Sequence, residues 1–318
     1  MGDRERPVCP ECGFIFYINP LVAVGALVEH EGKVALVRRG VEPGRGYWGL
    51  PAGYVEADES AEEAAVRETA EEAHLTVEID GLLDAFSYGM GQDRGVLLVY
   101  AAHLLSGEIA GGEIAGGEIA AGDDAVDAGW FGPDELPEIA FHTHRSVLRQ
   151  WRQARAVVYR PATLADAEVV TMLGEVYPAE ASGLCAREIG SAGRQLYVAL
   201  DKGQVIGFCG VTQDADTRTG RVVQVFVHPR YRRWGIGTHL LTCCVEACRE
   251  AGLRALLAQA PIANPGWGVY LKAGFRVSGL TNDYYGQDAS EDSRTALLLT
   301  YDLDRNPDPR LNRGRTED

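Results

Sequence analysis

Short apolar runs make up most of the first half of the chain. Residues 21–30 are apolar and β-branched, and residues 33–37 follow directly after a Glu31-Gly32 turn, which predicts a hairpin. Two more strands are predicted at residues 96–103 and 130–131.

Two amphipathic segments separate these runs. The first is predicted to form a helix over residues 60–73, where Ser60 and Glu63 fit a capping box. The second is predicted over residues 145–154, where apolar residues recur at helical spacing. Strands interleaved with helices predict an α/β (α+β) fold class.

The alternation of predicted strands and helices begins again after the second helix. Residues 157–162 indicate a new strand and turn, and residues 222–252 indicate a strand, a tight turn and a helix. We therefore expect a boundary near Arg155 between one domain at 21–154 and another at 157–303.

Two segments lie outside this pattern. GEIAG occurs at 107–111 and 112–116 and returns as GEIAA at 117–121, which predicts an expanded surface loop that arose by sequence duplication. The polar, proline-containing residues 304–318 predict a disordered tail.

Composition narrows the functional classes. The chain has 318 residues, 46% of them hydrophobic, and a net charge of −16, which argues against a general nucleic-acid binder. It has no apolar run long enough to span a membrane and no signal-like N-terminus, so neither membrane insertion nor secretion is expected. Seven cysteines without a framework spacing fit a reducing cytosol, so we expect a cytoplasmic protein.

Three carboxylates share one face of the first predicted helix. At about 3.6 residues per turn, Glu68, Glu71 and Glu72 fall within roughly 100° of one another. Their mutual repulsion is relieved by a cation, and Mg²⁺ or Mn²⁺ prefers such oxygen ligands. The alternative is a solvated acidic face on an Ala-rich helix.

The residues around this face resemble the Nudix signature. Gly53, Glu59 and the run from Arg67 to Leu75 keep its spacing and all its charged positions. Thr69 departs from it where an aliphatic residue is usual, and His74 departs where glycine is usual.

This resemblance implies a Nudix α/β/α sandwich and the hydrolysis of a nucleoside diphosphate linked to another moiety, such as ADP-ribose, FAD or NADH. It further implies that Glu68, Glu71 and Glu72 bind Mg²⁺ or Mn²⁺, with the backbone of Gly53 as a further ligand. Water attacks one phosphorus, and Glu72 or a loop carboxylate activates that water.

Other residues of this domain have two readings each. Arg67 is expected to orient the carboxylates rather than to contact the substrate. Arg38 and Arg39 either reach a phosphate or have a surface role. Trp48 either stacks on a base or packs in the core, and we favour packing. The loop carboxylate is sought at 123–124, two aspartates directly after the repeat.

Cys9 and Cys12 resemble one knuckle of the zinc ribbon that precedes some Nudix domains, within residues 1–20. Structural zinc takes four ligands, and this knuckle supplies two. We favour a degenerate site without zinc; the alternative is a zinc ion shared between subunits, as in a homodimer.

A glycine-containing turn in the second domain predicts a pyrophosphate site. Arg232 and Arg233 stand beside Gly235 and Gly237 at the start of an apolar-striped helix. Backbone N–H groups and the positive end of the helix dipole suit a diphosphate there.

This turn resembles motif A of the GNAT acetyltransferases, and the likeness covers about residues 157–303. It implies a mixed-sheet domain that binds acetyl-CoA, with Tyr270 protonating the departing CoA thiolate. The residues implied to contact the cofactor are Val225, Val227, Arg232, Arg233, Gly235, Ile236, Gly237, Thr238, Asn264 and Tyr270. Packing beside Phe275 is the other reading of Tyr270.

The acceptor is expected to be an amine of a small molecule or of a protein N-terminus. Tyr284-Tyr285 and Asp288-Ala289 faintly resemble the acceptor site of N-terminal acetyltransferases, and no base is identifiable, because a catalytic His228 is disfavoured. Cys243, Cys244 and Cys248 are expected to be small buried hydrophobes.

The sequence therefore predicts a bifunctional enzyme, a Mg²⁺-dependent pyrophosphohydrolase joined to an acetyl-CoA-dependent N-acetyltransferase. The alternative is that one half only senses its ligand, acetyl-CoA or a nucleotide, and regulates the other.

Overall fold

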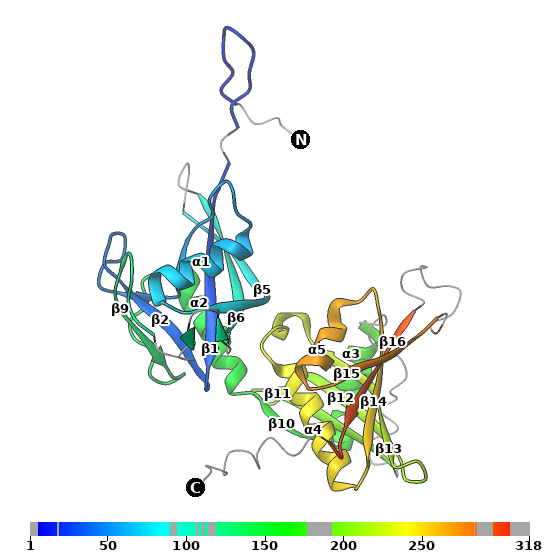
Figure 1. Cartoon of the computed structure of the whole chain (residues 1–318). Helices are drawn as coiled ribbons and strands as arrows, with labels where there is room; N and C mark the ends of the chain where they lie inside the picture. Colours follow the sequence, from blue (N-terminus) through cyan, green and yellow to red (C-terminus); the bar gives the residue numbers. More distant parts are fainter. Residues whose placement is uncertain are drawn as a thin grey trace. The chain divides into compact units, whose positions relative to one another are not determined.

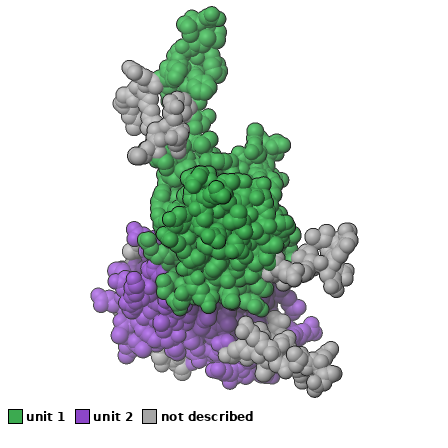
Figure 2. Space-filling view, turned by 90° about the vertical axis from the view of Figure 1, so that its left-hand side faces the viewer, with its two compact units in different colours: residues 1–152 green, residues 153–318 purple. Residues whose placement is uncertain are grey.

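The chain divides into two compact units, residues 1–152 and 153–318 (Figures 1 and 2). The computed structural model describes residues 6–17, 19–89, 94–105, 108–109, 112–113, 119–176, 193–282, 284 and 295–305. Most of the tandem repeat and residues 306–318 of the predicted tail lie outside these ranges. Within them, none of the helices has the length and apolar character needed to cross a membrane.

The described residues of the first unit form a large mixed sheet, a separate two-stranded sheet and two helices (Figure 1). Its strands are β1 (Leu21–His30), β2 (Lys33–Arg39), β3 (Trp48–Gly49), β4 (Ala52–Tyr54), β5 (Val77–Tyr88), β6 (Gly95–Leu104), β7 (Glu108–Ile109), β8 (Gly112–Glu113) and β9 (Ala125–Phe131). Its helices are α1 (Ala61–Ala73) and α2 (His142–Arg155), the last turn of which extends past the boundary between the units.

The large sheet has the order β3-β2-β1-β6-β5, with β4 paired to β1 and β9 paired to β2. β1 and β6 are parallel, and the other pairs are antiparallel. β4 lies against β1 in the register Val24 to Gly53, which brings the loop before α1 to the middle of the sheet.

Helices cover both faces of this sheet. Residues 24–28 of β1 are buried without alternation, as expected for a strand with apolar contacts on both sides. Ala64 and Ala65 of α1 pack against Val24 on one side. Figure 1 shows α2 behind the strands of the sheet. Trp151 of α2 is buried.

Most predicted elements of this unit are present with shifted ends. The predicted hairpin and first helix correspond to β1, β2 and α1, and the capping box of Ser60 and Glu63 is formed. The predicted two-residue strand at 130–131 is the end of the longer β9, and β5 was not predicted.

The second unit is built on a seven-stranded sheet in the order β10-β11-β12-β13-β14-β16-β15. Its strands are β10 (Val158–Pro161), β11 (Arg194–Asp201), β12 (Gln204–Asp214), β13 (Thr219–Val227), β14 (Ala255–Pro261), β15 (Arg276–Thr281) and β16 (Ala296–Asp302). Its helices are α3 (Ala167–Val176), α4 (Ile236–Glu250) and α5 (Gly268–Lys272).

β13 and β14 form the parallel pair of this sheet, and they separate along their length. Their pairing is confined to residues 219–221 with 255–257, although β13 continues to Val227 and β14 to Pro261. Backbone groups of both strands beyond this point therefore border a gap in the sheet.

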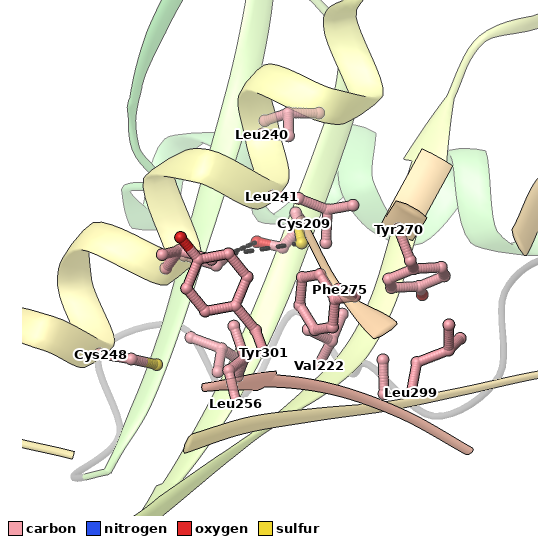
Figure 3. Close-up of a cluster of buried hydrophobic side chains, with 14 of the residues drawn as sticks. Cys209, Val222, Leu240, Leu241, Cys248, Leu256, Tyr270, Phe275, Leu299 and Tyr301 are labelled. Atoms are coloured by element: carbon pink, nitrogen blue, oxygen red, sulfur yellow. Dashed lines mark hydrogen bonds between the residues drawn. The ribbon is translucent and has the colours of Figure 1, made fainter. Parts of the chain in front are cut away.

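α4 covers one face of the sheet and α3 the other. Leu240 and Leu241 of α4 belong to the largest apolar cluster of the unit, together with Cys209 and Val222 of the strands (Figure 3). On the opposite face Val170 of α3 packs with phenylalanines of β12 and β13. The sheet of the second unit thus has an apolar cluster on each face.

Candidate functional site

Glu68 and Gly53 form the centre of the site in the first unit. Glu68 comes from α1 and Gly53 from β4, and a Cβ atom built on residue 53 would overlap the Glu68 carboxylate. Only glycine therefore lets this carboxylate lie directly against the strand. The Glu68 side chain is largely buried, at 13% relative exposure.

Arg67 links three of the acidic residues. Its Nη2 lies 2.6 Å from Oε1 of Glu59, and its Nη1 lies 2.8 Å from Oε1 of Glu68 and 3.0 Å from Oε2 of Glu71. Nη2 also donates to the carbonyl oxygen of Tyr54. Arg67 thus holds helix carboxylates in position and ties them to the loop before the helix.

Glu72 is the most deeply buried of the predicted metal ligands. Its Oε2 accepts a hydrogen bond of 2.9 Å from the N–H of Ala52. Burial, the strongest effect, together with the charges of Glu68 and Asp124, raises the pKa of Glu72 to about 7. Burial likewise raises the pKa of Glu68, with smaller contributions from Glu71 and Asp123.

The three predicted ligands do not converge on one point. In the part of the chain that the structure describes, no three acidic, histidine or cysteine side chains form a ready-made metal site. Glu71 faces Arg67, whereas Glu72 faces the backbone of Ala52. The donor set nevertheless fits a hard divalent cation, since oxygen atoms gather where burial makes negative charge costly and a cation would relieve it.

Arg39 is the basic residue whose field reaches Glu72. Its charge opposes the rise of the Glu72 pKa. Its Nε donates to the carbonyl oxygen of Pro43, and its guanidinium carbon lies 5.1 Å from the ring centroid of Phe141. Arg38 instead donates to the carbonyl oxygen of Gly46.

The aromatic side chains of Trp48 and His144 in this region pack against other residues of the fold. The ring of Trp48 lies edge-on to Phe131, with 4.8 Å between centroids, in keeping with a packing role. His144 is buried, and its Nδ1 accepts the N–H of Leu50 at 3.1 Å. Burial lowers the pKa of His144 to about 4. The sequence did not single out His144, because its partner is 94 residues away.

Cys9 and Cys12 lie on a formed hairpin. The N–H of Cys9 donates to the carbonyl oxygen of Phe14 at 2.8 Å, and Val8 bridges to Ile15. Hydrogen bonds, the strongest from the backbone of Cys12, lower the pKa of the Cys9 thiol. Among the described residues this knuckle still offers only two sulfur atoms, half of a structural zinc site.

The predicted pyrophosphate site of the second unit lies at the start of α4. Gly235 is the N-cap residue, with φ of 76°, and no side chain caps the helix. The N–H groups of the first helical turn are therefore available to an anion. Arg232, whose Nε donates to the carbonyl oxygen of Val227, lies between the end of β13 and this turn.

Gly237 brings the start of α4 close to neighbouring elements. A Cβ atom on residue 237 would lie 3.1 Å from Val269 and 3.5 Å from Val227. The helix N-terminus thus lies where β13 has separated from β14. The remaining predicted cofactor residues come from the end of β13, the turn and the start of α4: Val225, Arg233, Ile236 and Thr238.

Tyr270 and Asn264 are both engaged within the fold. The Tyr270 ring is 7% exposed and lies edge-on to Phe275, with 5.5 Å between centroids (Figure 3). Oδ1 of Asn264 accepts the N–H of Gly266 at 2.8 Å, which shapes the loop before α5. Packing of Tyr270 is thus observed, and a catalytic role for its hydroxyl remains a prediction.

The remaining predictions for this unit have mixed outcomes. Cys244 and Cys248 are buried, whereas Cys243 is partly exposed. Sγ of Cys244 lies 3.3 Å from Sγ of Cys209, a pairing that the sequence did not indicate. Tyr284 donates to Gln259, while Tyr285, Asp288 and Ala289 lie outside the described residues.

Two family models match the chain. Residues 19–151 match the NUDIX domain, and residues 165–275 match the Acetyltransferase (GNAT) family. The two matches fall on the two units and do not overlap.

Individual proteins give the same division. An ADP-ribose pyrophosphatase of Methanocaldococcus jannaschii is 35% identical over 137 residues, which are 42% of this chain and 75% of that protein. An NAD-capped RNA hydrolase NudC of Chromobacterium violaceum is 35% identical over 136 residues, which are 43% of this chain but only 47% of that protein. An IAA acetyltransferase of Azospirillum brasilense is 31% identical over 119 residues, which are 37% of this chain and 78% of that protein.

Proposed function

This chain belongs to the NUDIX family through its first unit and to the GNAT acetyltransferase family through its second, and we propose that it is a bifunctional enzyme with two separate sites. The first unit would hydrolyse a nucleoside diphosphate linked to a second moiety, with Mg²⁺ or Mn²⁺. The second would transfer an acetyl group from acetyl-CoA to an amine.

The observation that carries the hydrolase proposal is the buried carboxylate pair beside Gly53. Glu68 and Glu72 both have raised pKa values because burial leaves their charge without solvent. Sites in which burial and neighbouring charge shift a pKa are favoured places for binding and catalysis. We assign Glu68, Glu71, Glu72 and the backbone of Gly53 to hold the metal ion.

A few residues of the first unit would each have one role in the hydrolysis. Arg67 holds Glu68 and Glu71 in place before a cation binds, and Glu71 and Glu72 would turn toward the ion when it does. Glu72 or an aspartate of the 123–124 turn accepts the proton of the attacking water. Arg39 offers positive charge to a phosphate oxygen. When bound, the metal ion supplies charge neutralisation of the diphosphate.

ADP-ribose is the first substrate to test, because a relative at 35% identity carries the name ADP-ribose pyrophosphatase. The NudC relative adds NAD-type compounds, although the chain spans less than half of its length. A Mg²⁺-dependent hydrolysis screen over ADP-ribose, NADH, FAD and nucleoside triphosphates separates these classes. Equal rates for Glu72→Gln and wild type on the best substrate would refute the carboxylate assignment.

In the second unit, the observation that carries the proposal is the uncapped start of α4 beside the separating strands. The pyrophosphate of acetyl-CoA would bind the backbone N–H groups after Gly235, and the rest of the cofactor would lie along the open edges of β13 and β14. Tyr270 would return a proton to the CoA thiolate.

A sensor is the competing function for this unit. The sequence identifies no base for the acceptor amine, and a module that binds acetyl-CoA without turnover would need none. Release of CoA measured with a panel of small amines and peptide N-termini decides between them. Tight binding of acetyl-CoA without release on any acceptor would favour the sensor.

A further inference from the structure

The segment that leads into β9 is bound to the C-terminal end of α1. The last carbonyl groups of a helix have no partner within it. Here the N–H of Ala120 donates to the carbonyl oxygen of Ala73 at 3.2 Å, and the N–H of Gly122 donates to that of Glu72 at 3.1 Å. Residues distant from α1 in sequence thus cap the helix that carries the predicted metal ligands.

His74 adds a side-chain contact to this junction. It ends α1 in the left-handed conformation, with φ of 53°, where glycine would be free of strain. Its Nδ1 lies 3.0 Å from the carbonyl oxygen of Ala120. Because a carbonyl oxygen only accepts, Nδ1 carries the proton and donates. The imidazole therefore makes a bond that glycine at this position could not make.

Gly122 allows the two segments to approach this closely. A methyl group on residue 122 would overlap the carbonyl oxygen of Glu71 and the His74 ring. The carbonyl belongs to the helix backbone, so it cannot turn away as a flexible side chain would.

The turn that follows is also held from its other side. The N–H of Ala125 donates to Gly122 at 2.9 Å, which closes a turn over Asp123 and Asp124. The N–H of Gly40, just after β2, donates to the carbonyl oxygen of Asp124 at 2.7 Å. The two aspartates are therefore held between the end of α1 and the end of β2.

This placement brings the turn to the carboxylate site. The charge of Asp123 acts on Glu68, and the charge of Asp124 acts on Glu72. Two more carboxylates thus join a site whose predicted metal ligands Glu68, Glu71 and Glu72 all come from α1.

We infer that His74 is a positioning residue: with Gly122, it fixes the 119–125 segment on α1, so that the turn of Asp123 and Asp124 stays at the helix end that carries Glu72. The role of this placement in hydrolysis rests on the proposed function of the first unit. The contact itself does not rest on it.

Two variants of the exposed residue His74 test the inference without disturbing the core. His74→Gly keeps the backbone conformation and removes the ring, and His74→Asn tolerates the left-handed conformation and restores an N–H donor. Asp123→Asn/Asp124→Asn provides a second background for both.

Hydrogen exchange of the full chain measures the contact between the 119–125 segment and α1 independently of activity. We expect the amides of Ala120 and Gly122 to exchange at least about ten-fold faster in His74→Gly than in wild type, with the rest of α1 unchanged. His74→Asn should restore slow exchange. Unchanged exchange in His74→Gly would overturn the inference, whatever the enzyme hydrolyses.

Steady-state kinetics then measure the effect of the His74 substitution on hydrolysis. On the best diphosphate substrate, His74→Gly should lower kcat about ten-fold with little change in KM. It should have no further effect in the Asp123→Asn/Asp124→Asn background, since residues that act together are not additive. An equal loss in both backgrounds would overturn positioning through the aspartates. Absence of any hydrolysis by wild type would instead refute the proposed function and leave the exchange result to decide the contact.

Discussion

The carboxylate of Glu68 lies directly against Gly53, so close that a single methyl group on residue 53 would overlap it. This contact joins β4 to α1 at the predicted metal site. Because the overlapping atoms are the far end of a flexible side chain, Gly53→Ala should displace Glu68 rather than unfold the unit.

We therefore expect Gly53→Ala to separate activity from stability. The free energy of unfolding should change by about 1 kcal/mol or less, while hydrolysis falls by about a hundred-fold through displacement of a ligand. Urea denaturation and Mg²⁺-dependent hydrolysis measure the two effects. Gly25→Ala is a matched control on the adjoining strand, since its Cβ would make an ordinary contact of 3.4 Å with Ala52. Full activity of Gly53→Ala would contradict the assignment.

Removing Arg67 should lower both the stability of the first unit and its hydrolytic activity. Its partners Glu59 and Glu68 are only 14% and 13% exposed, so Arg67→Met leaves two largely buried carboxylates without a cation. We expect a loss of about 1–3 kcal/mol in the free energy of unfolding and a higher Mg²⁺ concentration for half-maximal activity.

Arg152→Met is the control for charge removal, since its partner Asp134 is 83% exposed and exposed pairs contribute little. Mg²⁺ should restore part of the stability lost in Arg67→Met, because a bound cation can replace the missing charge. Identical Mg²⁺ activation curves for Arg67→Met and wild type would show that Arg67 serves only the loop.

Local signals in the sequence predicted α1 well. Its capping residues, its helical spacing and its carboxylates all lie within one short segment. β5 was missed because two irregularities, at 79–81 and 82–84, interrupt the alternation that identifies a strand. Gly81, with φ of 138°, lies at the first of them.

Contacts between distant segments could not be predicted. The bond from Leu50 to His144 spans 94 residues, and neither position carries a local signal. The separation of β13 from β14 depends likewise on where their pairing stops. The predicted loop aspartates were found from the family resemblance, whereas the bonds that hold their turn on α1 appear only in the structure.

The buried His144 should make the first unit sensitive to acid. Its pKa of about 4 in the folded chain lies below the ordinary value of 6.5, so the folded state favours the neutral ring. The stabilisation of the folded state by the neutral ring is fully present above pH 6.5 and is lost as the pH falls toward 4.

Between pH 6.5 and pH 5 the free energy of unfolding should fall by about 2 kcal/mol through His144. His144→Gln retains an acceptor for the Leu50 N–H and does not titrate, so the difference between wild type and variant isolates this residue. Urea denaturation at several pH values measures it. A constant difference between the two proteins from pH 7 to pH 5 would show that His144 does not carry the effect.

Tyr270→Phe should separate packing from chemistry in the second unit. The phenylalanine ring can keep the edge-on contact with Phe275, so the free energy of unfolding should change by less than about 1 kcal/mol. If the hydroxyl protonates the CoA thiolate, acetyl transfer should fall by about a hundred-fold while acetyl-CoA binding is retained. Wild-type turnover by Tyr270→Phe would leave packing as the sole role of this residue.

Gly235→Ala should weaken acetyl-CoA binding and leave the hydrolase unaffected. Gly235 caps α4 with φ of 76°, where an alanine is strained by about 1 kcal/mol, and no Cβ contact blocks the substitution. Relaxing that strain turns the first N–H groups of α4 away from the bound diphosphate, so we expect the Kd for acetyl-CoA to rise about ten-fold. Gly268→Ala, which also meets open space but has no positive φ, is the matched control. Calorimetric titration with acetyl-CoA measures binding, and ADP-ribose hydrolysis by the same sample measures the first unit. An unchanged Kd would mean that the cofactor does not use this turn, whereas a parallel loss of hydrolysis would mean that the two sites are coupled.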